Sequence, residues 1–175
     1  MEERLNIVDD LGNIIGEDSR ESIHRKGFWH KVAHVWVINS KNEILLQKRS
    51  MEKEANPGLW DISVGGHIPA NENEISSAIR ETEEELGLKI EASELNFVGV
   101  VKDEYIKDDY IDNEQLYIYV VRKDVKLSEL HIQKEEVDEI KFVPLKIFKE
   151  MTADAGQILV ARPDEYELMF KYLNV

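Results

Sequence analysis

Residues 66–88 read GHIPANENEISSAIRETEEELGL, and this stretch decides the fold. It predicts a helix over residues 71–86, because Asn71 followed three residues later by Glu74 has the pattern of an N-terminal capping box. Gly87 suits the position just past a helix end. At 100° per residue, one stripe of the helix should pack on a sheet; it consists of Ile75, Ala78, Ile79, Thr82 and Leu86.

Three glutamates lie together on an adjacent arc of the predicted helix. Spacings of three and four residues bring Glu81, Glu84 and Glu85 onto one face, with Arg80 beside them. Like charges at this spacing cost roughly a few tenths of a kcal/mol per pair, and a bound cation would turn that repulsion into affinity. Oxygen ligands suit hard ions such as Mg²⁺ and Mn²⁺. Taken alone, however, such a cluster is more typical of a solvated helix face.

The wider spacing resembles the Nudix box, G-x5-E-x7-R-E-U-x-E-E-x-G-U, where U is a bulky apolar residue. Every charged and glycine position is met over residues 66–88, and only Thr82 departs, at the first U. The resemblance implies an α/β fold, namely a Nudix-type α/β/α sandwich with a mixed sheet. It also implies that Glu81, Glu84 and Glu85 bind Mg²⁺ or Mn²⁺ in a hydrolase that cleaves a diphosphate linkage. Supporting roles would fall to Gly66, Glu72, Arg80 and Gly87.

The rest of the chain predicts strands mixed with a few helices, which indicates one layered α/β domain over residues 1–175. An N-terminal β-hairpin is expected from residues 5–8 and 14–15, joined by a Gly/Asn turn. Further strands are expected over residues 31–39, 43–49, 59–64, 95–102, 115–122 and 139–143. Helices are expected over residues 144–151 and 163–173.

Composition restricts the class of partner. The net charge of −14 disfavours nucleic-acid backbones and anionic membranes, and no apolar run approaches the roughly 20 residues that span a bilayer. The absence of cysteine excludes disulfides, thiolate metal sites and thiol catalysis. The expectation is a cytoplasmic protein, monomeric or homodimeric, that binds a small-molecule diphosphate and neither nucleic acid nor membrane.

A second set of residues resembles the Nudix branch that contains type I isopentenyl-diphosphate isomerases and their hydrolase relatives. The matching segments are Trp29–Asn39, Leu46–Arg49, Lys53, Pro57–Trp60 and Gly66-His67. In the isomerases, histidines and carboxylates from scattered segments hold a divalent metal; the matching positions are His30, His67, Asp112 and Glu114, with His24 a looser match. Each histidine has a structural alternative, which is preferred for His34 and His131.

Three functions remain open from the sequence: a hydrolase, an isomerase, and a nucleotide-sensing module without turnover. The isomerase cysteine would fall at Gly65, and the intact box favours hydrolysis of a nucleoside diphosphate or its derivative. Glu81, Glu84 and Glu114 are the expected catalytic carboxylates, with Glu84 or Glu114 as the base. Specificity is expected within residues 102–114. Arg49 and Lys53 either clamp the diphosphate or are surface cations; the candidates for stacking are Trp29, Trp60, Tyr105 and Tyr110, which are equally suited to the core.

Overall fold

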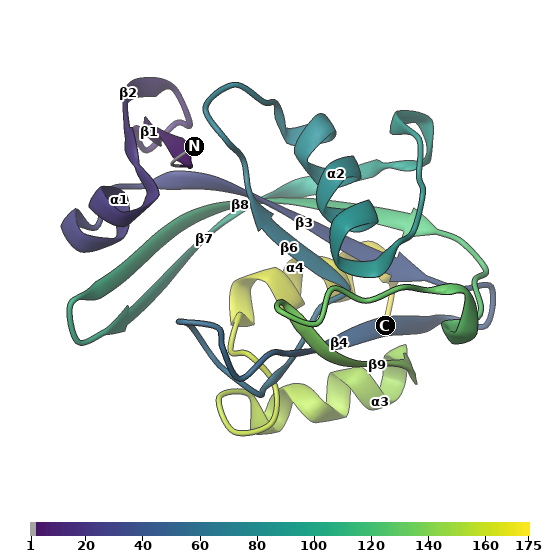
Figure 1. Ribbon diagram of the computed structural model, residues 1–175. Helices are drawn as coiled ribbons and strands as arrows, with labels where there is room; N and C mark the ends of the chain where they lie inside the picture. Colours follow the sequence, from purple (N-terminus) through teal and green to yellow (C-terminus); the bar gives the residue numbers. More distant parts are fainter. Residues whose placement is uncertain (1–2) are drawn as a thin grey trace.

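The computed structural model describes residues 3–175, in which helices cover both faces of a mixed sheet (Figure 1). The strands are β1 (Arg4–Val8), β2 (Ile14–Ser19), β3 (His30–Ile38), β4 (Glu43–Arg49), β5 (Trp60–Asp61), β6 (Val64–His67), β7 (Asn96–Lys107), β8 (Tyr110–Arg122) and β9 (Val137–Pro144). The helices are α1 (Arg20–Lys26), α2 (Glu74–Leu86), α3 (Leu145–Met151) and α4 (Pro163–Leu173). Short 3₁₀ turns lie at Ala92–Glu94, Leu127–Glu129 and Thr152–Asp154.

Strand β3 separates two apolar cores, because successive side chains point to opposite faces of a sheet. Val32, Trp36 and Ile38 pack with Phe148 of α3 and Met169 of α4. On the other face, a second cluster joins β3 to α2; it contains Ala33, Val35, Val37, Ala78 and Leu86. The predicted α/β/α sandwich is therefore confirmed, with α2 on one face and α3 and α4 on the other (Figure 1).

The main sheet has the order β5-β4-β3-β8-β7 and is mixed, because β3 runs parallel to β8 while its other neighbours are antiparallel. Strands β3 and β4 share a single residue pair, Ile38 with Ile44. Beyond that pair β3 turns to β6 and β4 turns to β9. The sheet thus splits between β3 and β4 as the two strands leave their common turn.

The predicted N-terminal hairpin is confirmed as β1 and β2. It leads into α1, a helix that the sequence did not predict. Ser19 caps the start of α1 by accepting a hydrogen bond from the backbone N–H of Ser22, and Gly27 ends it with φ 66°.

Helix α2 begins later than expected, so the predicted cap at Asn71 and Glu74 is wrong. Asn73 is the N-cap, and its side chain and that of Ser76 bond reciprocally to each other's backbone N–H. The shift follows from a turn before the helix, in which the N–H of Glu72 bonds to the carbonyl of Pro69. Ile75, expected in the buried stripe, is 45% exposed because it lies in the first turn, whereas Gly87 ends the helix as predicted.

The single strand expected over residues 59–64 is two strands. β5 pairs with β4 through Asp61 and Gln47, whereas β6 pairs with β3 through Val64 and Val35, so the chain changes partner between them. The hairpin β7–β8 is also longer than expected, and it turns through Asp108 at φ 52°. None of the helices within residues 3–175 is long and apolar enough to cross a bilayer.

Candidate active site

A cavity of about 260 Å³ brings together most of the residues singled out in the sequence. Helix α2 supplies one wall, and His34, Asp61, Asp103 and Arg162 lie on the wall toward α4. The predicted residues that line the cavity are Arg49, Lys53, Gly66, His67, Arg80, Glu81, Glu84, Glu85, Asp112 and Glu114. The remaining ones, His30, Glu72 and Gly87, are not among the lining residues.

Arg80 organises the carboxylates of the α2 wall. Its Nε donates to both oxygens of Glu72, at 3.0 and 3.1 Å, and its Nη1 donates to Glu81 at 2.8 Å and Glu84 at 2.9 Å. Glu72 is itself held by the hydroxyl of Ser77 at 2.7 Å. The guanidinium therefore ties the loop before α2 to the two carboxylates and partly neutralises their repulsion.

Glu85 and Glu81 are carboxyls with raised pKa values. Burial, followed by the charge of Glu81, raises the pKa of Glu85 from 4.5 to about 8. Gln47 donates to Glu85 at 3.0 Å and fixes its orientation. Burial also raises the pKa of Glu81, although Arg80 opposes this effect. The Glu85 carboxyl therefore holds a proton near neutral pH that a divalent cation would displace.

Gly66 permits the close approach of strand and helix. A Cβ atom at this position would overlap the side chain of Glu81, so only glycine leaves room for that carboxylate against β6. The carbonyl of His67, the next residue, accepts a long hydrogen bond of 3.5 Å from Arg80. Strand β6 and helix α2 are therefore fitted to each other at the cavity.

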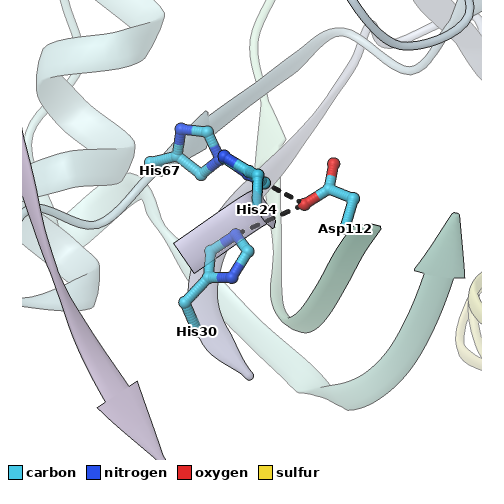
Figure 2. A group of neighbouring side chains, drawn as sticks. All are labelled: His24, His30, His67 and Asp112. Atoms are coloured by element: carbon cyan, nitrogen blue, oxygen red, sulfur yellow. Dashed lines mark ion pairs between the residues drawn. The ribbon is translucent and has the colours of Figure 1, made fainter. Parts of the chain in front are cut away.

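A cluster of three histidines and one aspartate adjoins this wall (Figure 2). His24 comes from α1, His30 from the start of β3, His67 from the end of β6 and Asp112 from β8. One potential ligand atom from each lies within 4.8 Å of the others. Asp112 Oδ1 is 3.1 Å from His24 Nε2 and 3.4 Å from His30 Nε2, as the dashed lines show.

The atoms of this cluster fit a metal ion. His24 Nε2, His30 Nε2 and Asp112 Oδ1 are buried, yet none has a partner in hydrogen-bond geometry. Buried polar atoms are normally satisfied, so three that converge indicate a missing partner. Burial and the neighbouring charge of His30 lower the pKa of His67 well below 6.5, which keeps its imidazole neutral as metal binding requires. Burial opposes ionisation of Asp112, but His24 and His30 outweigh it and hold its pKa below the usual range.

The composition of this cluster differs from the sequence expectation. His24, the looser match, belongs to it, whereas Glu114 does not. Glu114 lines the same cavity as Glu84 and Glu85. Its alternation with Leu116 puts it on the α4 face of the sheet, however, whereas the two glutamates come from α2 on the other face. Burial, followed by the charge of Asp112, raises the pKa of Glu114 well above 4.5.

The two predicted phosphate-binding cations line the cavity but are paired with carboxylates. Arg49 donates to Asp61 at 3.1 Å and to the carbonyl of Ala55 at 3.0 Å. Lys53 forms an ion pair with Glu136. An anion in the cavity would thus compete with Glu136 for the lysine, while Arg49 is held more firmly.

Sequence analysis missed the polar residues of the α4 wall. Arg162 forms an ion pair with Asp61, and His34 is bonded to Glu165. One signal was present: His34 follows His30 and Val32 at the spacing that places alternate strand residues on one face. Of the four aromatic candidates, Tyr105 and Tyr110 line the cavity. Tyr110 also stacks on His24, with 4.7 Å between the centroids of the two rings.

Comparison with known proteins finds a matching family model and similar individual proteins. A family model described as NUDIX domain matches residues 29–161. A Nudix hydrolase of Clostridium acetobutylicum is 35% identical over 139 residues, covering 78% of this chain and 67% of the relative. Nudix hydrolase 3 of Arabidopsis thaliana is 35% identical over 85% of this chain, but the match spans only 20% of that protein.

An isomerase and a solved structure also match. Isopentenyl-diphosphate Delta-isomerase 2 of Photorhabdus laumondii is 29% identical over 98% of this chain and 90% of the relative. A crystal structure from Deinococcus radiodurans superposes with a TM-score of 0.71 over 97% of this chain and 98% of that one, at 20% identity. At that identity, the structural match bears on the fold alone.

Proposed function

Because the chain belongs to the Nudix hydrolase family, we propose that it is a divalent-metal-dependent enzyme that cleaves a diphosphate linkage in a nucleoside diphosphate or a derivative of one. The observation that supports this best is the α2 wall, where Glu81, Glu84 and Glu85 face one cavity and Arg80 holds two of them. The complete acidic wall argues against a sensing module that has lost turnover. We further propose that residues 3–175 act as one domain, since both cores pack on the same sheet.

Glu81, Glu84 and Glu85 would hold Mg²⁺ or Mn²⁺, because these hard ions prefer carboxylate oxygens. When bound, such an ion neutralises phosphoryl charge and acidifies a water molecule. Glu84 is the half-exposed member of the set and is the proposed base for that water. Glu114 would be a poorer base, because burial raises its pKa and favours the protonated carboxyl.

The histidine cluster would hold a second divalent ion beside the first. Nitrogen ligands with one carboxylate suit Mn²⁺, Zn²⁺ or Fe²⁺ better than Mg²⁺. His67 links the two sites, since its backbone carbonyl contacts Arg80 while its ring belongs to the cluster. Two ions could then neutralise both halves of a diphosphate group.

The size of the cavity suits the diphosphate group alone. Its volume of about 260 Å³ is just below the range of about 300–1,000 Å³ typical of ligand pockets. A second cavity, of about 660 Å³, shares Arg20, Glu54 and Tyr110 with it and extends along α1 to residues 107–109. We propose that the rest of the substrate occupies this second cavity, in agreement with the expectation that residues 102–114 set specificity.

Isopentenyl-diphosphate isomerisation is the second candidate, and the histidine cluster is the observation that favours it. Against it stands Gly65, which occupies the position of the isomerase cysteine and offers no proton.

The deciding experiment is an activity screen in Mg²⁺ and in Mn²⁺ over nucleoside diphosphates and triphosphates, dinucleoside polyphosphates, nucleotide sugars and isopentenyl diphosphate. Release of a nucleoside monophosphate or phosphate is expected, with a loss of orders of magnitude in Glu84→Gln. Glu83→Gln is the matched control, because Glu83 lies on the same helix but is exposed and outside the cavity. Dimethylallyl diphosphate as the sole product would establish the isomerase, and no turnover of any compound would refute both candidates.

A further inference from the structure

His34 and Glu165 form a buried pair on the α4 wall that the proposed chemistry has not used. His34 is 2% exposed and Glu165 is fully buried. His34 Nδ1 lies 3.0 Å from each oxygen of the Glu165 carboxylate, and the indole N–H of Trp36 donates to the same carboxylate at 2.9 Å. The carboxylate therefore fixes the orientation of the ring and places a proton on Nδ1.

The opposite edge of the ring faces Gly65. A Cβ atom at Gly65 would lie 3.1 Å from both Nε2 and Cδ2 of His34, so a larger residue would crowd this edge. His34 and Gly65 both line the cavity. Within residues 3–175, the hydrogen bonds of the ring are made at Nδ1, which leaves Nε2 for whatever the cavity holds.

The charges around the pair keep the Glu165 carboxylate ionised. Burial alone would raise the pKa of Glu165, but the positive charges of His34 and Arg162 outweigh burial and hold it below 4.5. The carboxylate is therefore ionised. An ionised carboxylate on Nδ1 orients an imidazole and stabilises its protonated form, as in hydrolases that use a carboxylate–histidine pair.

We propose that His34 is a catalytic residue that donates the proton on Nε2 to the leaving oxygen of the diphosphate, and that Glu165 is the residue that positions it. The proposal rests on the proposed hydrolase activity. The α2 glutamates and His34, which lies on the α4 face of the sheet, line the same cavity, so the two walls can contact opposite sides of one phosphorus. Attacking and leaving oxygens in phosphoryl transfer are roughly in line, which requires two such sides.

Atoms and charge balance in this step. The water oxygen forms a bond to one phosphorus and gives up one proton to Glu84 on the α2 wall. The bond between that phosphorus and the bridging oxygen breaks, and its electron pair stays on the bridging oxygen. That oxygen takes the proton from His34 Nε2, leaving a neutral imidazole that keeps its bond to Glu165. Solvent then returns a proton to the imidazole and takes the proton from Glu84.

The test compares full-length wild type, His34→Ala, Glu165→Gln and His131→Ala, with and without added imidazole. Turnover is measured on ADP, ADP-ribose, diadenosine tetraphosphate and UDP-glucose in Mg²⁺, and Mg²⁺ affinity is measured by calorimetry. His131 is the control, because it is an exposed histidine that does not line the cavity. Glu165→Gln keeps the volume of the side chain, so it still tests the proposal if His34→Ala fails to fold.

For His34→Ala we expect kcat to fall about 10²–10⁴-fold, the range for loss of an acid–base group, with KM within about threefold. Added imidazole should restore part of the kcat of His34→Ala and should not change the kcat of His131→Ala. The Mg²⁺ affinity of His34→Ala should equal that of wild type. The kcat of Glu165→Gln should fall at least about tenfold, because the His34 ring loses the charge that orients it. Normal kcat in both variants, or a loss that imidazole does not rescue in folded protein, would overturn the role of His34. Wild type inactive on every compound would instead refute the proposed hydrolase.

Discussion

Glu85 gives the sharpest quantitative prediction, because its carboxyl is buried before any metal binds. Its pKa of about 8 in the folded protein compares with 4.5 for the unfolded chain. The folded state therefore binds more protons than the unfolded state between these pH values, so metal-free stability falls as pH rises from about 4.5 to about 8. A tenfold difference in proton affinity corresponds to about 1.4 kcal/mol. At pH 7 the ionisable carboxyl therefore lowers the free energy of unfolding by about 3 kcal/mol relative to a side chain that stays neutral in both states.

Glu85→Gln removes the ionisation and keeps the shape of the side chain. In EDTA at pH 7, the variant should be about 3 kcal/mol more stable than wild type, or roughly 6–12 °C higher in Tm for a chain of this length. At pH 5 the difference should shrink to below about 1 kcal/mol. Added Mg²⁺ should stabilise wild type more than the variant, since the variant lacks one of the three proposed ligands.

The assay is urea and thermal unfolding of both proteins at pH 5, 7 and 8, in EDTA and in Mg²⁺. Glu83→Gln on the exposed side of the same helix is the matched control and should show no such pH-dependent gain. If Glu85→Gln is less stable than wild type at pH 7 in EDTA, or if its advantage does not change with pH, the reasoning from burial is refuted.

Three further predictions concern the strand–helix contact, the histidine cluster and the helix cap. Gly66→Ala should displace the Glu81 carboxylate and reduce kcat at least about 10²-fold with little change in Tm; normal turnover would show that the contact is unimportant. His67→Asn should bind one Mn²⁺ fewer by calorimetry and keep the site on the glutamates, and an unchanged stoichiometry would exclude His67 as a ligand. Asn73→Ala should cost about 1 kcal/mol in urea unfolding, whereas Asn71→Ala should cost almost nothing, and the reverse order would restore the cap predicted from sequence.

The sequence was sufficient for those features that local spacing determines. Strand Glu43–Arg49 and helix Pro163–Leu173 were predicted with their observed bounds. The glutamates of α2 share a cavity as the helical spacing required, and Arg80 pairs with Glu72 as the family resemblance implied. In each case the deciding interactions lie within a few turns of one helix or one strand.

Features that depend on distant partners could not be predicted. The chain between Asp61 and Val64 changes from one neighbouring strand to another, which no local pattern records. His24 joins the histidine cluster only because α1 packs on β8, and α1 itself was missed. The role of His34 depends on Glu165, which lies 131 residues away in the chain.

The ring stacking of Tyr110 on His24 has a consequence for how the enzyme selects its substrate. The same tyrosine borders the cavity lined by the α2 glutamates and the larger cavity beside α1. It is the first residue of β8, directly after the turn of a long hairpin, and such turns tolerate changes of length and sequence better than the sheet behind them. Substitutions at this end of the hairpin could therefore change which substrate group is recognised while the glutamates of α2 stay the same. Relatives that share the glutamates need not act on the same compound.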